Sequence, residues 1–365
     1  MASHSLQLDQ ALLTRVEAQA AKRAKLGKER RQRTQDRQEL ARLLGRSLTE
    51  ICSVQLPTLH QYLRHLQVVY RYVEEHGIQA GSSAQMDAML TQLFDKLYLD
   101  GHPPDLGSKI VAAINCFFPD AKGSLPRAAR SLKGWARLAP QRTRAPLPWL
   151  ALMAMVGAAV AHDDLLMAVA MILQFVTCLR PGELCGLQPA NLIASGPRGA
   201  SQRPSRALLL GAFELGRANK SNEFDESVVV DRPDLPWLNH YLGVLKRRPR
   251  GAPVWDFSQE EYAHKLKTYA TLSGVAVLEP DAYALRHGGA SDDMLALRRP
   301  AADIKRRGRW KSDSSLRRYE KRAVAQLQVN MLSQDTLAYG LNVEKNLVSL
   351  MMGVIKLPPP AALAG

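Results

Sequence analysis

The chain of 365 residues is 46% hydrophobic and 23% charged, which is ordinary for a soluble globular protein with room for two domains and excludes a low-complexity chain. Its four cysteines include no CxxC pair, which excludes zinc-finger spacing, and we expect reduced, buried thiols in an intracellular protein. The 49 Lys and Arg residues against 34 Asp and Glu residues give a net charge of +15, so nucleic acid is the expected partner and solubility by charge repulsion is the alternative.

The first 56 residues are polar and helix-prone, and they contain a basic run at 22–33. We expect a solvated arm, partly disordered or helical; an arm on the DNA backbone and a nuclear import signal are the alternatives. Residues 1–20 lack the apolar stretch of a signal peptide. The longest apolar stretch, at 150–161, is shorter than the roughly 20 residues of a membrane span, so we expect a buried helix there and no membrane partner.

Residues 57–139 form the first predicted domain. Apolar residues recur at helical spacing in four segments, at about 57–76, 86–99, 106–118 and 127–138. The polar faces of these helices carry arginines and lysines, so we expect an all-helical, DNA-binding domain. The segment 140–148 follows, with Arg142 and Arg144 set between prolines. It predicts a linker whose arginines contact DNA.

Residues 149–330 form the second predicted domain, in which helices and strands are mixed. Two apolar helices are expected at 149–161 and 164–178, and short strands at 207–213 and 227–231. Further helices are expected at about 235–246, 258–273, 285–296, 301–307 and 312–319. The predicted fold is mainly α, with a small antiparallel β-sheet in the C-terminal domain. The tail, 331–365, holds an apolar segment that docks either on its own domain or on a neighbouring protomer.

Three strings in the second domain carry residues suited to phosphodiester chemistry. Arg180 ends an apolar helix, and Glu183, three residues later, can pair with it and fix its orientation. Arg286 lies in Tyr-Ala-Leu-Arg-His, before a run of small residues at 288–291 that lets a helix pack closely on a neighbour. Two guanidinium groups suit the non-bridging oxygens of a phosphodiester. The hydroxyl of Tyr319, which lies among basic residues, can attack the phosphorus.

The order of five residues resembles the catalytic set of the tyrosine recombinase family: Arg180, Lys220, Arg286, Trp310 and Tyr319. The first arginine string resembles the family's first arginine box, and the second resembles its His-x-Leu-Arg-His box. Within the family, the small residues after these boxes look most like those of recombinases from eukaryotic mobile elements, the crypton group. The resemblance implies a two-domain clamp on DNA, with a helical core-binding domain and a catalytic domain.

The resemblance also implies a role for each residue. Tyr319 attacks the scissile phosphate, while Arg180 and Arg286 hold its non-bridging oxygens. Lys220, in a turn between two strands, protonates the departing 5′ oxygen. Trp310, which is similar to the tryptophan of Cre-type recombinases, holds a phosphate oxygen or supports the site, because an indole N–H only donates.

One position departs from the family's pattern. Most members carry histidine where this chain has Tyr283, and a phenol is a poor base near neutrality. We therefore expect Tyr283 to assist by hydrogen bonding. His287 matches the family's second histidine and, like Glu183, is expected to support the site. Four basic neighbours of the tyrosine are expected to contact DNA: Arg309, Lys311, Arg317 and Arg318.

These features predict a site-specific DNA recombinase or integrase that forms a 3′-phosphotyrosyl intermediate and needs no metal, cofactor or ATP. The expected partners are double-stranded DNA with an inverted-repeat target and, by family habit, a homotetramer on that DNA. The expected location is with DNA inside the cell, in the nucleus of a eukaryote or the cytoplasm and nucleoid of a bacterium. Two alternatives stay open: a DNA-binding protein of the same fold without cleavage, which Tyr283 permits, and a type IB topoisomerase.

Overall fold

The computed structural model describes residues 35–78, 81–140, 145–194, 206–211, 226–249, 251–320 and 322–360. Contacts between residues divide the chain into two compact units, Met1–Arg142 and Thr143–Gly365, and each unit has a hydrophobic core of its own. The division falls inside the segment 140–148, where the prolines predict a linker. Within the described ranges, none of the helices reaches the length and hydropathy that crossing a membrane needs.

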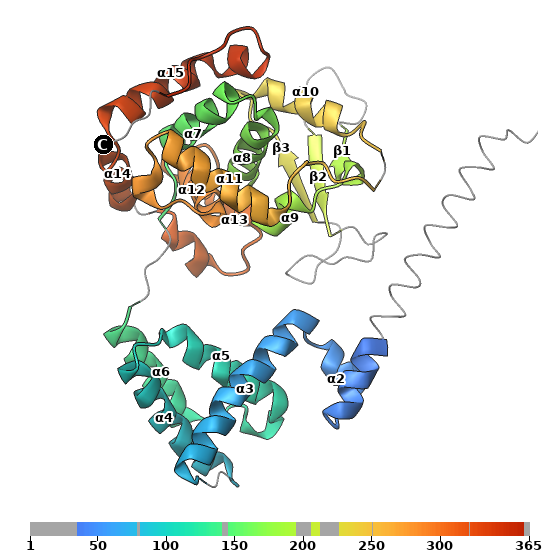
Figure 1. Ribbon diagram of the computed structural model, residues 1–365, viewed down its shortest axis with the longest axis vertical. Helices are drawn as coiled ribbons and strands as arrows, with labels where there is room; N and C mark the ends of the chain where they lie inside the picture. The colour runs from blue at the N-terminus through green and yellow to red at the C-terminus, as the bar shows by residue number, and fades with distance from the viewer. Residues whose placement is uncertain are drawn as a thin grey trace, which may run out of the picture. The chain divides into compact units, whose positions relative to one another are not determined.

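In its described part, the first unit is built from helices (Figure 1). Residues 35–43 are helical. The elements that follow are α2 (Leu48–Cys52), α3 (Leu56–His76), α4 (Ser83–Leu99), α5 (Pro104–Phe117), the 3-10 helix η1 (Pro119–Ala121) and α6 (Pro126–Leu138). The four predicted helices are confirmed as α3 to α6. Gly77 ends α3 with a φ of 60°, in the left-handed region that favours glycine.

The folded part of the first unit begins before the predicted domain start. The sequence predicts an arm over 1–56, whereas Ala41 and Ile51 are buried in the same core as Leu59 and Phe94. The two short helices before α3 are polar on most of their surface, and only these few apolar positions join the core. The polar composition of this segment therefore does not reveal that it packs in the core of the first unit.

Two close contacts hold α6 in the first unit. Asp87 of α4 is buried, and its carboxylate accepts hydrogen bonds from the backbone N–H groups of Arg127 and Ala128, at 3.0 and 2.7 Å. It thereby satisfies donors in the first turn of α6, which have no partner within that helix. At Gly107 of α5, an added Cβ would lie 2.5 Å from the side chain of Leu132, so only glycine lets the two helices approach this closely.

The apolar helices α7 (Trp149–Ala161) and α8 (Leu165–Thr177) lie in the middle of the second unit (Figure 1). All residues at 151–159 and at 167–177 are buried, so neighbouring elements cover both helices on all sides. The other helices of the unit are α9 (Pro181–Cys185), η2 (Pro189–Asn191), α10 (Pro236–Leu245), α11 (Gln259–Leu272), η4 (Ala276–Leu278), α12 (Ala282–Leu295), α13 (Ala301–Gly308), η5 (Asp313–Arg318), α14 (Arg322–Asn330) and α15 (Gln334–Met351).

A small sheet lies at one edge of the second unit (Figure 1). Its antiparallel strands are arranged in the order β1 (Leu192–Ile193), β2 (Arg206–Leu210) and β3 (Glu226–Val230). Leu208 of β2 pairs with Leu192 on one side and Val228 on the other, and all three side chains are buried. The two predicted strands are thus confirmed, whereas β1 is too short to show an alternating pattern in the sequence.

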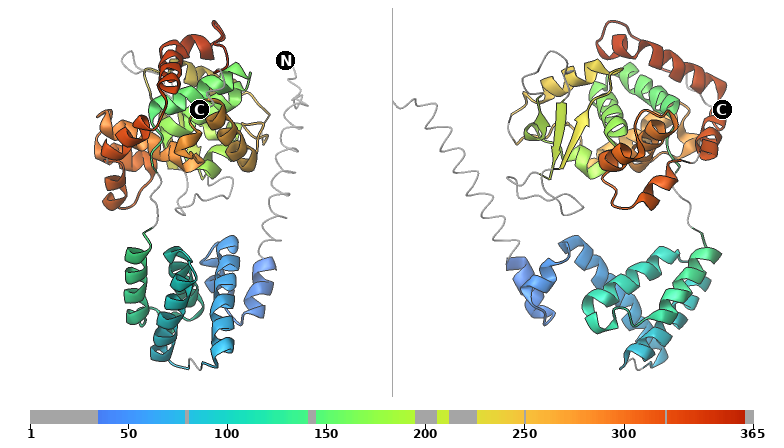
Figure 2. Two further views of the ribbon diagram at one scale, coloured as in Figure 1. Left: turned by 60° about the vertical axis from the view of Figure 1, so that its left-hand side comes forward. Right: turned by 180° about the vertical axis from the view of Figure 1, so that it is seen from behind.

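The C-terminal helix α15 packs on α7 of the same chain (Figure 2). At Gly157 of α7, an added Cβ would lie 2.4 Å from Val343, which is fully buried. At Gly340 of α15, an added Cβ would lie 2.5 Å from the carbonyl oxygen of Leu150. Of the two destinations that the sequence leaves open for the tail at 331–365, the structure shows the first, because α15 docks on its own domain.

The helix that carries the second arginine string, α12, packs equally closely on α8. An added Cβ at Gly289 would lie 1.8 Å from the carbonyl oxygen of Phe175, and one at Gly288 would lie 2.3 Å from that of Leu147. The close helix contact predicted from the small residues at 288–291 is therefore confirmed. This contact fixes the position of α12, and hence of Arg286, relative to α8.

We predict that Gly289→Ala destabilises the second unit by roughly 2 kcal/mol, because the backbone of α8 must move to admit a methyl group. Thermal unfolding of the full chain, followed by circular dichroism, measures the effect. Gly134→Ala is the matched control, since an added Cβ there meets no atom within 4 Å and alanine favours a helix. Equal midpoints for wild type and Gly289→Ala would show that α12 is not held against α8 in this way.

Candidate functional site

The loop between α8 and α9 positions the first arginine. Cys178 ends α8 with a φ of 50°, in the left-handed region, and Arg180 precedes α9 in an extended conformation. The guanidinium of Arg180 donates to Glu183 over 2.5 Å, and the backbone N–H of Arg180 donates to the other carboxylate oxygen over 2.8 Å. The predicted pairing of these residues is confirmed, and Glu183 fixes both the backbone and the side chain of Arg180.

Glu183 also binds a second cation, Arg309, which follows α13 with a φ of 54°. Only 3% of the Arg309 side chain is exposed. Its guanidinium donates to Glu183, to the carbonyl oxygen of Arg307 at 2.9 Å and to that of Cys178 at 3.4 Å. The sequence predicts that Arg309 contacts DNA, whereas the structure places its guanidinium in the interior. Its left-handed backbone turns the side chain back toward Glu183, where it holds the carboxylate that orients Arg180.

The second arginine of the predicted set, Arg286 of α12, is 3% exposed. Its two terminal nitrogens donate to the carbonyl oxygens of Cys178 and Gly308. Burial, followed by the neighbouring cations Arg309 and Arg180, lowers the pKa of Arg286 to about 10. The guanidinium therefore keeps its charge at neutral pH, but in an environment that opposes it.

Arg286 differs from the other buried arginines near it in its partners. Arg307 of α13 pairs with Asp231 at the end of β3, and Arg299 donates to both oxygens of the same carboxylate at 2.7 and 2.9 Å. Among the described residues, no carboxylate lies within ion-pair distance of Arg286. A buried charge without a counter-ion is costly, so this position favours an incoming anion.

Trp310 joins Arg286 to the predicted nucleophile. The centre of its indole lies 5.0 Å from Cζ of Arg286 and 4.8 Å from the ring centre of Tyr319. Gly308 makes room for the indole, because an added Cβ there would lie 1.8 Å from it. A guanidinium against an aromatic face gains from the ring's negative face. Trp310 therefore packs against both residues, as expected of a supporting side chain.

Tyr319 lies directly after η5, and only 3% of it is exposed. Its ring stacks on His287 of α12, with ring centres 5.4 Å apart and planes 28° from parallel. The hydroxyl oxygen of Tyr319 lies 2.9 Å from Nδ1 of His287, within hydrogen-bond distance. Residues from distant parts of the sequence thus form one cluster: Arg180, Arg286, His287, Trp310 and Tyr319.

The other predicted site residues are half-buried, exposed or outside the described part of the chain. Tyr283 is half-buried on α12, one helical turn before Arg286 and His287. Lys311 and Arg317 are exposed, as a DNA contact requires. Four predictions fall outside what the structure describes, and they remain untested: Arg142, Arg144, Lys220 and the side chain of Arg318.

Sequence patterns missed the parts that hold the cluster together. The bond between Arg309 and Glu183 spans 126 positions, and those from Asp231 to Arg299 and Arg307 span 68 and 76. No local pattern can report pairs this far apart. The signal closest to them is the left-handed turn after α13, where a glycine precedes Arg309.

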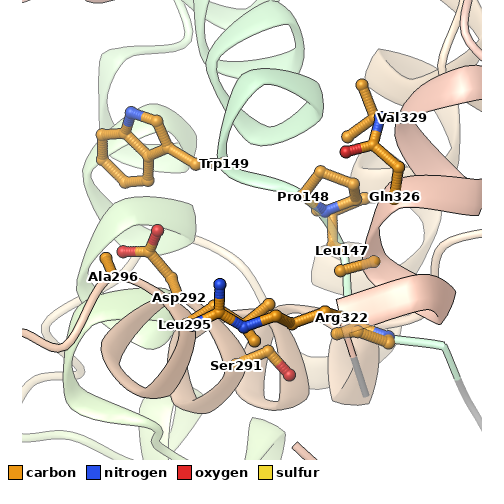
Figure 3. Close-up of a pocket in the computed structure, with 13 residues that line it drawn as sticks. Leu147, Pro148, Trp149, Ser291, Asp292, Leu295, Ala296, Arg322, Gln326 and Val329 are labelled. Atoms are coloured by element: carbon orange, nitrogen blue, oxygen red, sulfur yellow. The ribbon is translucent and has the colours of Figure 1, made fainter. Parts of the chain in front are cut away.

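A separate cavity of about 390 Å³ lies between residues 146–149, α12 and α14 (Figure 3). Trp149 and Asp292 lie on one side of it, and Gln326 and Val329 lie on another (Figure 3). None of the predicted catalytic residues that the structure describes lines it. The cavity is therefore distinct from the cluster around Arg286, although both are partly built by α12.

Comparisons with known proteins are sparse. No protein-family model matches the chain, and a search of curated proteins finds no match. Among solved structures, the chain is similar to one titled "Crystal structure of XerH site-specific recombinase bound to difH substrate: pre-cleavage complex". The match has 12% sequence identity and a TM-score of 0.33, and it covers 74% of this chain and 94% of the other. A TM-score this low does not establish a shared fold.

We predict that Glu183→Gln destabilises the second unit by roughly 3 kcal/mol, because it removes the closer of the two carboxylates that pair with the buried Arg309 charge and leaves Glu226 at 3.7 Å. Asp313→Asn removes the partner of Lys305 in a pair whose carboxylate is 81% exposed, and should change stability by less than about 1 kcal/mol. Urea unfolding of the full chain compares the two variants. Similar losses in both would contradict the clamping role of Glu183.

Proposed function

We propose that this protein cleaves and rejoins DNA strands through a covalent link between Tyr319 and a 3′ phosphate, as a site-specific recombinase. In the first step the oxygen of Tyr319 forms a bond to phosphorus, and the bond from phosphorus to the 5′ oxygen breaks. The departing oxygen takes a proton and leaves as a 5′ hydroxyl. A 5′ hydroxyl of another strand then attacks the same phosphorus and releases Tyr319. The phosphate bond energy stays in the link, so the reaction consumes no ATP.

The observation that carries this proposal is the buried charge of Arg286. It has no carboxylate partner in the described part of the chain, and Arg309 and Arg180 add positive charge around it. A phosphodiester group supplies the missing negative charge. The transition state of its cleavage carries more negative charge than the substrate does. Arg286 and Arg180 are therefore assigned to the non-bridging oxygens.

A second observation supports the assignment of Tyr319 as the nucleophile. Trp310 contacts both Arg286 and Tyr319, so an anion held by Arg286 lies close to the tyrosine in the fold. The hydroxyl of Tyr319 is turned toward His287, and its side chain is almost completely buried. We infer that DNA binding draws η5 and Tyr319 outward, since a short 3-10 helix has weaker hydrogen bonds to break than an α-helix has.

The remaining roles follow from the resemblance to tyrosine recombinases. Lys220 lies in the segment that links β2 to β3, and it is assigned to the proton that the 5′ oxygen takes. Glu226, the first residue of β3, lies 3.7 Å from Arg309, which supports a place for this hairpin beside the cluster. Tyr283 is assigned a hydrogen bond to the phosphate. We also propose that the two units clamp DNA and that the target is an inverted repeat. The protein would act on it as a homotetramer and would come from a mobile element.

We predict that the chain forms a denaturant-resistant adduct with DNA, and that Tyr319→Phe forms none. The probe is a pool of random-sequence duplexes, labelled at the 5′ end of the cleaved strand and nicked so that the short 5′-hydroxyl fragment diffuses away. The labelled strand then stays on the protein through its 3′ phosphate. The adduct should survive EDTA, since no step uses a metal ion. An adduct that persists in Tyr319→Phe would refute the assignment of the nucleophile.

We also predict that Arg286→Lys lowers the rate of adduct formation by about 100-fold or more, because a lysine cannot keep both carbonyl contacts and also hold phosphate. Arg306→Lys is the matched control, since Arg306 lies on the neighbouring helix α13 and its side chain is 80% exposed. The rate is measured in single turnover on sequences recovered from the adduct. Equal rates for wild type and Arg286→Lys would remove Arg286 from the phosphate site.

Two rival functions give different results in the same assay. A protein that binds DNA without cleaving it gives salt-sensitive binding and no adduct from any sequence in the pool. A type IB topoisomerase relaxes supercoiled plasmid as a monomer, and its adducts show little sequence preference. Recombination predicts adducts confined to related sequences. The half-buried Tyr283, which replaces the family's usual histidine, is the feature that favours DNA binding without cleavage as an alternative.

A further inference from the structure

The imidazole of His287 contacts the hydroxyl of Tyr319. Its Nδ1 lies 2.9 Å from the hydroxyl oxygen, and the stacked rings hold this geometry from two elements, α12 and the end of η5. The sequence predicts only a supporting role for His287. A distance of 2.6 to 3.2 Å between heavy atoms is, however, the reach that a general base requires.

The attacking tyrosine needs a base. An ordinary phenol titrates near pH 10, so very little of it is ionised at neutral pH. Imidazole is the side chain that ordinarily exchanges a proton between pH 5 and 8. Of the other groups in contact with the tyrosine or its neighbours, the indole of Trp310 and the guanidinium of Arg286 carry only donors, so neither can take a proton.

We infer that His287 is the general base that activates Tyr319, an inference that rests on the proposed function. In cleavage, the hydroxyl proton of Tyr319 moves to Nδ1 of His287 as the tyrosine oxygen bonds to phosphorus and the 5′ oxygen leaves. The 5′ oxygen takes its proton from a different group, assigned above to Lys220. In rejoining, the bond from phosphorus to the tyrosine oxygen breaks, and the imidazolium returns the proton to Tyr319.

This assignment explains how the site works with a tyrosine at position 283. His287 follows Tyr283 by four residues on α12, which places both on one face of the helix. The chain therefore presents an imidazole one turn further along the same helix. His287 touches the reacting oxygen itself, whereas Glu183 and Arg309 act through Arg180.

The charged and titratable groups around the pair come from several elements. They are Tyr319 after η5, Tyr283 and Arg286 on α12, Arg180 and Glu183 at α9, Arg309 after α13, and Cys178 after α8. Burial raises the pKa of the Cys178 thiol to about 11, so it stays neutral near pH 7. Arginine side chains stay charged over this range. An imidazole is the group of this set that ordinarily titrates between pH 5 and 8.

His287→Asn tests the inference on the full chain. The amide of asparagine can occupy the place of Nδ1 and keep a hydrogen bond to Tyr319, but it cannot accept a proton near neutral pH. We expect single-turnover cleavage of the recovered DNA sequences to fall by about 100-fold or more. The wild-type rate should rise between about pH 5 and 8 and that of the variant should not. A variant that keeps both the wild-type rate and its pH profile overturns the inference.

A chemical rescue separates proton transfer from structural support. In His287→Ala, added imidazole should restore cleavage by about 10-fold or more, in proportion to the neutral form of the added base. A purely structural role for His287 gives no such dependence. Rescue is read at saturating DNA, so a variant that binds DNA weakly is still measured. Absence of rescue, together with a wild-type pH profile in His287→Asn, overturns the inference.

A substrate with sulfur in place of the bridging 5′ oxygen shows which proton His287 handles. A thiolate leaves without a proton, so this substrate should restore cleavage by Lys220→Ala but not by His287→Asn. Equal restoration of both variants would place His287 on the leaving group and overturn the inference. If the wild type forms no Tyr319-dependent adduct, the proposed function itself is wrong. Failure of the proposed function is therefore distinguishable from failure of the His287 inference.

Discussion

The buried charge of Arg286, which has no carboxylate within ion-pair distance in the described part of the chain, is the constraint around which the site is arranged. Arg286 donates to the carbonyl oxygens of Cys178 and Gly308, which stand at the C-terminal ends of α8 and α13. Helix C-termini carry partial negative charge, so these two ends offset part of the buried cation. The offset is incomplete, because Arg180 and Arg309 oppose the charge of Arg286. The folded protein thus holds a position prepared for an anion.

The elements around Arg286 hold it by close packing and by paired charges. The glycines of α12 bring it against α8 at a distance that no larger residue permits. Glu183 binds Arg180 and the buried Arg309 together, so the first arginine and the turn after α13 are fixed by one carboxylate. Trp310 then occupies the space above Gly308 and contacts both Arg286 and Tyr319. Each contact limits the freedom of the next, which is how a catalytic geometry is prepared before substrate binds.

The same arrangement connects binding with reactivity. Tyr319 is buried, and its hydroxyl oxygen lies against His287. In the proposed reaction the anion satisfies Arg286, the tyrosine moves to the phosphorus, and the imidazole that held its hydroxyl takes the proton. The charge of Arg286 and the base His287 then lie on α12, and the nucleophile Tyr319 lies at the end of η5 in the same unit.

From the sequence alone we predicted the longer helices, two of the three strands and the linker at 140–148, because periodicity, proline and glycine act locally. The residues of the candidate set came from the resemblance to a family. The sequence also showed that Glu183 can pair with Arg180, since three positions separate them. The tertiary structure was needed to show that Arg309 is interior, that no carboxylate of the described residues lies within ion-pair distance of Arg286, and that His287 contacts Tyr319. These facts depend on pairs of residues that lie from 32 to 126 positions apart. Which distant groups meet is set by the packing of helices, and local patterns carry no record of it.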